Sequence, residues 1–187
     1  MPTRLSAQNS ALVLVDVQGK LARMMPDAES LIHRICVLLQ GAVQLDIPIL
    51  WLEQNPAGLG PTVPEISALL SARRPIAKQH FDACSEPDFA RQVAALNRPY
   101  LILCGIEAHI CVLQTALGLL AQKHAVYIIA DAVASKQEAH KQLALQRLTQ
   151  EGCRLCNVEM LLFEWLASAL HPAFKPLLPL IKSLPSL

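Results

Sequence analysis

The feature that most constrains the fold is a repeated alternation of short apolar runs with segments of helical periodicity. The apolar runs are rich in β-branched residues and reach the length of buried strands. Six runs of this kind are Ala11–Val17, Ile47–Leu52, Pro75–Lys78, Tyr100–Cys104, Ala125–Ala130 and Cys153–Val158. Because strands that alternate with helices form parallel sheets, the sequence predicts an α/β fold with helices on both faces of the sheet.

Helical spacing predicts the segments between these runs. The expected helices are Ala28–Leu45, Pro64–Ser71, a segment from Ser85 or Asp88 to Leu96, a segment from His109 onward, Lys136–Gln150 and Glu159–Ala169. Asn55–Pro64 is so rich in Pro and Gly that we expect a loop without regular structure. Residues 1–187 fit a single domain, and we interpret His171–Leu187 as an ordered extension over a neighbouring surface, at a subunit interface.

Composition excludes several classes of protein. Hydrophobic residues make up 53% of the chain and charged residues 17%, which argues against disorder and favours a homo-oligomer whose subunits cover apolar surface. A net charge of +1 without a basic block argues against nucleic-acid binding. The apolar runs are too short for a membrane span. Six cysteines without a signal-peptide core indicate a reduced, cytoplasmic chain.

Cys111 is the strongest candidate for a reactive residue. Gly105 ends an apolar run, and the helical spacing that begins at His109 places Cys111 in the first turn of a helix. Unpaired N–H groups and the helix dipole predict a lowered thiol pKa there, as nucleophilic attack requires. The alternative is a buried helix cysteine that acts as a small hydrophobe.

Asp16 and Lys78 stand at the ends of two other predicted strands. Parallel sheets bind ligands at the carboxyl ends of their strands, so these two residues and Cys111 are expected at one edge. Lys78 then stabilises a thiolate, Asp16 accepts the thiol proton, and backbone N–H groups from Gly105 to Cys111 bind an oxyanion. The alternative is an ion pair that only ties two strand ends, beside an inert cysteine.

Three motifs carry a resemblance to a known family: Leu14-Val-Asp16-Val-Gln18, Ile76-Ala-Lys78-Gln-His-Phe81 and Gly105-Ile-Glu-Ala-His-Ile-Cys111. Over nearly its whole length the chain resembles the isochorismatase-like cysteine hydrolase superfamily. The segments Glu53–Glu65, Asp131–Ser135 and Val158–Glu164 resemble its branch called isochorismatase domain-containing proteins. The resemblance implies a three-layer Rossmann-like fold with a six-stranded parallel sheet.

The resemblance also implies a mechanism. Asp16, Lys78 and Cys111 correspond to a catalytic triad, and a cis peptide is expected between Ile106 and Glu107. This peptide would direct the N–H of Glu107, with that of Cys111, at the oxyanion. The implied reaction cleaves a small amide-type C–N bond through a thioester, releases ammonia or an amine, and needs no cofactor.

The sequence differs from two groups of the superfamily, and both differences restrict the expected reaction. Nicotinamidases of the superfamily carry a metal-binding Asp-x-His motif, but the corresponding segment reads Trp51-Leu-Glu-Gln-Asn-Pro, so we expect no metal. True isochorismatases cleave a vinyl ether and lack the nucleophilic cysteine, so Cys111 argues against that reaction.

Four residues near strand ends are predicted to line a mostly apolar substrate pocket: Gln18, Trp51, Gln54 and Phe81. Such a pocket suits a small, neutral molecule. The sequence therefore predicts a cysteine-dependent amidase-like hydrolase. The alternative is a non-catalytic, oligomeric binding or scaffold protein that retains the fold. Neither Cys153-x-x-Cys156, which lies in a predicted strand, nor Cys84 is expected to take part in chemistry.

Overall fold

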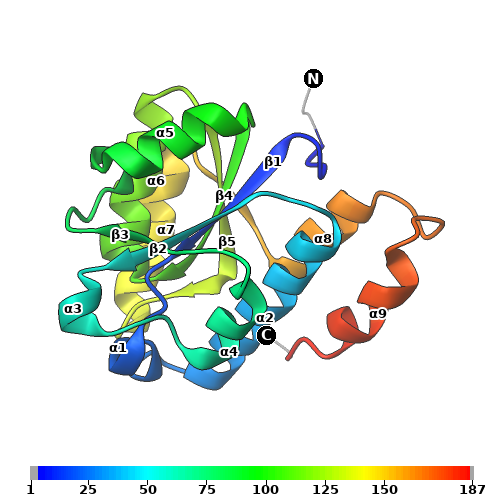
Figure 1. Cartoon of the computed structure of the whole chain (residues 1–187), viewed down its shortest axis with the longest axis horizontal. Coiled ribbons are helices and arrows are strands. Elements are labelled where there is room, and N and C mark those ends of the chain that lie inside the picture. The colour runs from blue at the N-terminus through cyan, green and yellow to red at the C-terminus, as the bar shows by residue number, and fades with distance from the viewer. Residues whose placement is uncertain (1–3, 186–187) are drawn as a thin grey trace.

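The computed structural model describes residues 4–185 as a six-stranded sheet between two layers of helices (Figure 1). The strands are β1 (Ser10–Val15), β2 (Ile49–Gln54), β3 (Ile76–Lys78), β4 (Tyr100–Ile106), β5 (Ala125–Ala134) and β6 (Arg154–Cys156). Their spatial order is β3-β2-β1-β4-β5-β6, and every neighbouring pair is parallel. The predicted α/β fold with a six-stranded parallel sheet is therefore confirmed.

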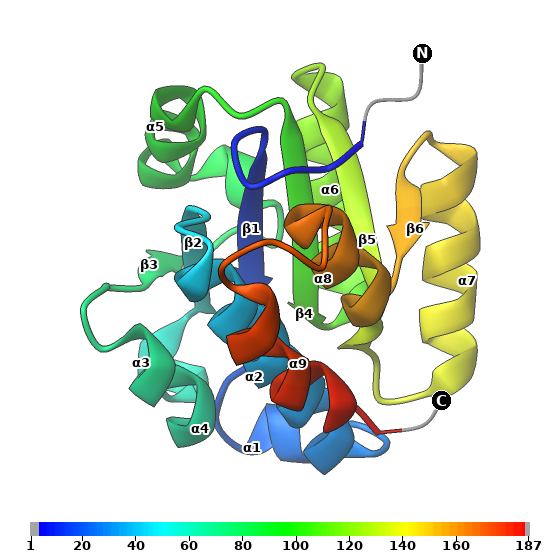
Figure 2. The same cartoon turned by 90° about the vertical axis from the view of Figure 1, so that its right-hand side faces the viewer.

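The helices form a layer on each face of the sheet. One face carries α5 (Pro87–Leu96), α6 (Leu113–Ala121) and α7 (Glu138–Gln150), and the other carries α2 (Ala28–Gln44) and α8 (Val158–Leu166) (Figures 1 and 2). Short helices gather near the carboxyl ends of the strands: α1 (Gly19–Arg23), α3 (Pro56–Leu59), α4 (Pro64–Ser67), η1 (Ala68–Leu70), η2 (Ala83–Ser85) and the π-helical turn η3 (Ala108–Val112).

Strand β1 explains why the sheet needs both helical layers. All six of its residues are buried, and successive side chains point to opposite faces. Leu12 and Leu14 belong to the apolar core shared with α2 and α8, whereas Val13 and Val15 belong to the core shared with α5 and α6. A strand that is apolar on both faces is stable only at the centre of a sandwich of this kind.

The crevice between β1 and β4 marks the point where strand order reverses, since β2 follows on one side of β1 and β4 lies on the other. Ligand sites of open parallel sheets lie at such a point. Gly105, which is paired with Val15, has a φ of +117°. A Cβ atom on Gly105 would lie 2.0 Å from the carbonyl oxygen of Val15, so only glycine lets the two strands approach here.

The structure corrects several predicted boundaries. Asn55–Pro64 was expected to be irregular, but it contains α3, because Pro56 at the first helical position is compatible with a helix start. Cys111 lies in the π-helical turn η3 that precedes α6, and not in an ordinary α-helical first turn. Strand β5 continues four residues past the predicted end at Ala130.

The C-terminal segment forms α9 (Phe174–Lys182), which packs over α2 and α8 of its own chain (Figure 2). Leu177 and Ile181 are buried, and His33 of α2 lies within 3.0 Å of both the carbonyl and the hydroxyl oxygen of Ser183. The expected ordered extension thus covers an intramolecular surface. Its place at a subunit interface stays a prediction, and residues 186–187 lie outside the described part of the chain.

Among residues 4–185, no helix combines the length and apolar character that crossing a lipid bilayer requires.

Gly105→Ala tests the close approach of β1 and β4. We expect it to lower the free energy of unfolding by at least about 3 kcal/mol, because it combines backbone strain with a clash against Val15. Gly152→Ala is the matched control: Gly152 has a φ of +103° with open space around it, so about 1 kcal/mol of strain is expected. Urea unfolding of both variants measures the difference, and equal losses would contradict the argument.

Candidate active site

A cavity of about 100 Å³ opens where the carboxyl ends of β1, β2 and β4 meet. Its lining residues come from segments that are far apart in the sequence: Asp16, Leu21, Gln54, Leu59, Phe81, Ile106, Glu107, Ile110 and Cys111. Two larger grooves, of about 600 and 450 Å³, lie beside α7 and β6. We assign the candidate site to the smaller cavity, because it contains the carboxylate and the thiol that sequence analysis singled out.

Asp16 and Lys78 form a buried ion pair at this edge of the sheet. Lys78 Nζ lies 2.8 Å from Asp16 Oδ2, and both side chains are almost fully buried. Asp16 has a φ of 51°, in the left-handed region that Asp tolerates better than most residues. Within residues 4–185 neither carboxylate oxygen of Asp16 takes part in a well-aligned hydrogen bond. Lone pairs of this carboxylate are therefore available to a proton.

The ammonium group of Lys78 forms one ion pair and donates two hydrogen bonds. It contacts Asp16, donates to Gln54 Oε1 at 2.6 Å, and donates to the carbonyl oxygen of His80 at 3.3 Å. Gln54 in turn donates from Nε2 to the carbonyl oxygen of Gln79 at 2.8 Å. The turn that follows β3 thus supplies two carbonyl oxygens that position Lys78 and Gln54.

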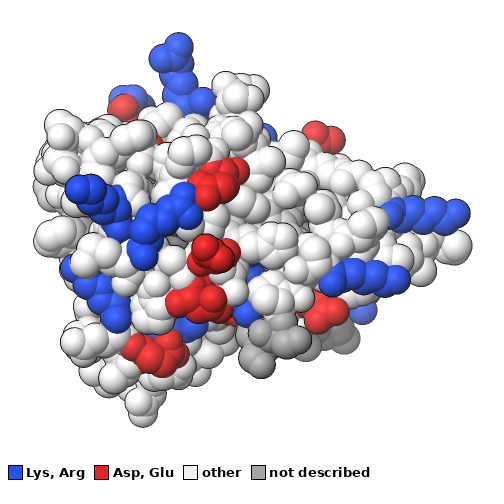
Figure 3. Space-filling model, turned by 90° about the horizontal axis from the view of Figure 1, so that it is seen from below, with Lys and Arg blue, Asp and Glu red and all other residues white. Residues whose placement is uncertain are grey.

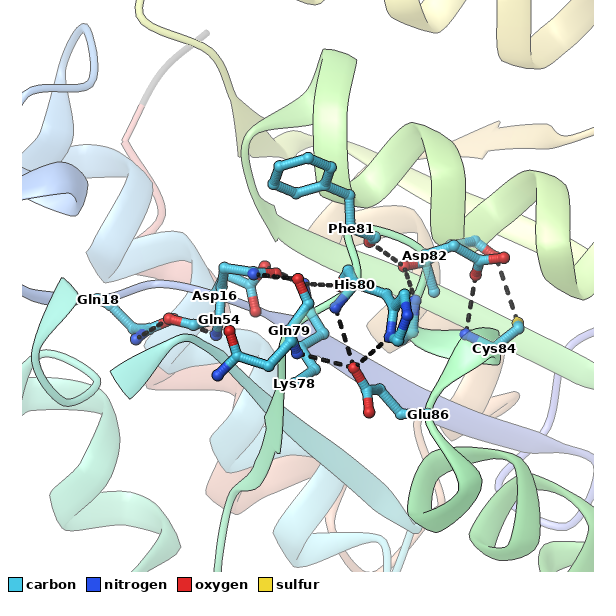
Figure 4. A network of polar contacts seen from close by, with 12 residues as sticks. Asp16, Gln18, Gln54, Lys78, Gln79, His80, Phe81, Asp82, Cys84 and Glu86 are labelled. Carbon is cyan, nitrogen blue, oxygen red and sulfur yellow. Dashed lines mark hydrogen bonds and ion pairs between the residues drawn. The ribbon is translucent and has the colours of Figure 1, made fainter. Parts of the chain in front are cut away.

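Glu86 holds that turn in place (Figure 4). Its Oε1 accepts from the backbone N–H groups of Gln79 at 2.7 Å and His80 at 3.0 Å, and it lies 2.9 Å from His80 Nδ1. These hydrogen bonds lower the pKa of Glu86 to about 2. A carboxylate outside the cavity therefore fixes the backbone on which the buried ammonium group depends.

The Cys111 thiol is 7% exposed and faces the cavity from η3, directly after the cis peptide between Ile106 and Glu107. Burial and the nearby negative charge of Asp16 raise its pKa to about 12, against a smaller lowering by Lys78. The predicted lowering of the thiol pKa is therefore wrong. Burial and the Asp16 carboxylate outweigh the ammonium group of Lys78.

The pKa of Asp16 is also raised, chiefly by burial, although the Lys78 charge opposes this. A carboxylate with a raised pKa accepts a proton more readily than a solvated one. The pKa values of Asp16 and of Cys111 are thus both raised, and burial is the largest cause in each case.

The other cysteines show that a raised pKa alone does not single out Cys111. Burial raises the pKa of Cys84 and of Cys153 to about 12 as well. What distinguishes Cys111 is a place on the cavity wall with Asp16 beside it.

Two of the four predicted pocket residues line the cavity, namely Gln54 and Phe81. Trp51 does not, because it is three positions before Gln54 on β2 and points to the opposite face, where its Nε1 donates to Thr62 Oγ1. Gln18 is also outside the lining: its side chain is fully buried and bonds to the backbone of Gln54 and Gly60.

Sequence reasoning missed three apolar wall residues, Leu21, Leu59 and Ile110. Leu21 and Leu59 lie on α1 and α3, which are too short to show a periodic pattern. Ile110 is adjacent to Cys111 and could have been found from that position alone. In the described part of the chain, no three His, Cys, Asp or Glu side chains are grouped so that they could hold a metal ion.

Comparison with known proteins adds to this geometry. The sequence pattern of the isochorismatase domain matches residues 10–160. The chain belongs to the isochorismatase family. It is 36% identical to isochorismatase domain-containing protein 2 of Danio rerio, over 95% of this chain and 89% of that protein. It is also 36% identical to the protein of the same name from Homo sapiens, over 93% and 83% of the two chains.

Solved structures of related proteins have the same fold. A structure of the MAR1 ribonuclease from Caenorhabditis elegans superposes on this isochorismatase-family chain with a TM-score of 0.92 and 34% identity, over 98% of this chain and 95% of that one. The YcaC gene product of Escherichia coli, described as an octameric hydrolase of unknown specificity, gives a TM-score of 0.86 at 24% identity, over 99% and 100% of the chains, which shows the fold alone. Family membership supports a hydrolase-type function.

Asp16→Asn separates thiol acidity from catalysis. Removing the negative charge takes away a cause of the raised Cys111 pKa, so we expect the pH profile of Cys111 alkylation by iodoacetamide to move to lower pH by about one unit. Peptide mass spectrometry measures the rate at each pH. A profile that stays in place or moves to higher pH in this variant would contradict the electrostatic argument.

Glu86→Gln tests the clamp on the turn after β3. The pKa of Glu86 is depressed in the folded state, so its stabilisation is present above the ordinary value of 4.5 and is lost as pH falls toward about 2. We expect the variant to be less stable than wild type by roughly 1–2 kcal/mol at pH 7, the size of a weakened charge-assisted hydrogen bond, and the difference to shrink at pH 3. A pH-independent difference in urea unfolding would refute this role.

Proposed function

We propose that the protein is a cysteine-dependent hydrolase that cleaves the C–N bond of small amides through a thioester. The observation that carries the proposal is the juxtaposition of Cys111 with the Asp16–Lys78 ion pair on the wall of one small cavity. A thiol, a carboxylate with a raised pKa and a fixed ammonium group provide a nucleophile, a proton acceptor and a countercharge.

In the first half of the reaction, Cys111 Sγ attacks the amide carbonyl carbon while its proton moves to Asp16. Since the thiol is protonated at rest, attack and proton transfer occur together. Lys78 keeps Asp16 ionised until the substrate arrives, because the ion pair offsets part of the cost of a buried carboxylate. The N–H groups of Glu107 and Cys111 stabilise the oxyanion. The C–N bond then breaks, and Asp16 returns the proton to the departing nitrogen.

In the second half, the thioester is hydrolysed. The Asp16 carboxylate, again ionised, removes a proton from water, whose oxygen attacks the thioester carbonyl. The C–S bond breaks, the carboxylic acid leaves, and the proton on Asp16 returns to the Cys111 sulfur. The same carboxylate therefore serves both halves, which agrees with its raised pKa.

Other activities fit the cavity less well. Cleavage of RNA, suggested by the name of the Caenorhabditis elegans relative, calls for room for a nucleotide and for cationic groups that contact phosphate. The cavity of about 100 Å³ carries the carboxylates Asp16 and Glu107, and basic and acidic side chains are interspersed on the molecular face seen in Figure 3. The second candidate is a non-catalytic scaffold, favoured only by exposed apolar residues such as Leu143 and Met160.

The same exposed residues support self-association, and one fold relative is described as octameric. A homo-oligomer is therefore part of the proposal. So is a reduced, cytoplasmic environment, because all six cysteines are free.

Release of ammonia from small neutral amides tests the function. We expect the wild-type protein to release ammonia and Cys111→Ala to be slower by at least about a thousandfold, since the nucleophile is lost. Cys36→Ala removes a thiol on α2 outside the cavity and is expected to match wild type. Cleavage that persists in Cys111→Ala would overturn the mechanism, and no cleavage by the wild type would favour the scaffold alternative.

A further inference from the structure

The volume of the cavity limits what the site accepts. About 100 Å³ is room for roughly three water-sized groups, whereas pockets for drug-sized ligands measure about 300–1,000 Å³. With the amide group placed at Cys111, little of this volume remains, so only a short acyl chain fits. An aromatic ring or a longer chain would overlap the walls.

The charges around the cavity restrict the substrate further. Asp16 and Glu107 are the charged residues of the lining, and both carry carboxyl groups. The ammonium group of Lys78 is nearby, but it is already paired with Asp16 and donates to Gln54 and to the His80 carbonyl. An acyl group with its own carboxylate would thus lose its water and face negative charge, with no cationic side chain among the described residues that line the cavity.

The walls farthest from the core are the side chains of Leu59 and Phe81, which are 38% and 51% exposed. Their backbones are fixed. Gln18 Nε2 donates to the carbonyl oxygen of Gly60 at 2.7 Å, directly after Leu59, and Thr115 Oγ1 donates to the carbonyl oxygen of Phe81 at 3.3 Å. Because their backbones are fixed, these two side chains do not move easily to admit a larger substrate, and they discriminate between substrates by size.

We propose that this cavity selects the primary amides of short, uncharged aliphatic acids, and that Leu59 and Phe81 set the upper limit on acyl length. The inference rests on the proposed amidase function and names its substrate class. It assigns size selection to two side chains outside the Asp16–Lys78–Cys111 group, and it explains charge selection by the lack of a free cation among the lining residues.

A series of amides tests the size limit. Wild-type protein is given acetamide, propionamide, butyramide, hexanamide and benzamide, and ammonia release gives kcat/KM. We expect hexanamide and benzamide to be at least about tenfold poorer than butyramide, the lower end of discrimination by methylene groups in a pocket. Leu59→Ala and Phe81→Ala are expected to raise the ratio of kcat/KM for hexanamide to kcat/KM for acetamide by a similar factor. Leu143→Ala, on the outer surface of α7, is the control and leaves the ratio unchanged.

A pair of amides with the same number of heavy atoms tests charge selection. Isobutyramide and oxamate have similar shapes, but oxamate carries a carboxylate where isobutyramide has an isopropyl group. We expect kcat/KM to be at least about tenfold higher for isobutyramide than for oxamate, because no cationic side chain among the described lining residues compensates the buried carboxylate of oxamate. Equal rates for the two amides, or equal rates for acetamide and hexanamide, would overturn the inference.

Protection of Cys111 from iodoacetamide separates this inference from the proposed function. Acetamide and isobutyramide are expected to slow alkylation of Cys111, while hexanamide and oxamate are not, whether or not turnover follows. Size-dependent protection without ammonia release would refute the amidase function and keep the selectivity. Ammonia release with protection that ignores size and charge would refute the selectivity and keep the function.

Discussion

The arrangement at the carboxyl end of the sheet depends on the ion pair between Asp16 and Lys78. These residues close β1 and β3, which are separated by β2, so the pair spans three strands. Two buried charges are tolerated only when they are paired and hydrogen-bonded. That requirement explains the contacts around Lys78. Gln54 and the His80 carbonyl accept hydrogen bonds from its ammonium group, and Glu86 fixes the turn that carries this carbonyl.

The same pair influences the acidity of the thiol. A cysteine beside an ammonium group alone would lose its proton easily, but burial and the negative charge of Asp16 raise the Cys111 pKa to about 12. The site therefore does not store a thiolate.

Sequence reasoning predicts the parts of this site that depend on strand ends. Asp16 and Lys78 terminate apolar runs, and a parallel sheet brings such ends to one edge, so their proximity follows from periodicity. Trp51 and Gln54 were both predicted to line the pocket, but residues three apart on a strand face opposite sides of the sheet. The alternation of side chains along a strand would have improved that prediction. The cavity walls on α1 and α3 carry no periodic signal because each helix is about one turn long.

The sign of the Cys111 pKa shift could not follow from sequence. It depends on the balance between the distances from the sulfur to one negative and one positive charge, and on how deeply the turn is buried. The position of Gln18 is a similar case: its side chain is close to the site but bonds to Gly60, which lies 42 positions away in the sequence.

Acylation of Cys111 is the most direct measure of the mechanism. The protein is mixed with propionamide, quenched in acid during turnover, digested and examined by peptide mass spectrometry. Covalent catalysis predicts a propionyl group on the peptide that contains Cys111, removable by hydroxylamine as a thioester, and absent from the peptide that contains Cys84. Ammonia release with no acyl group on Cys111, in samples quenched across the whole time course, would contradict it.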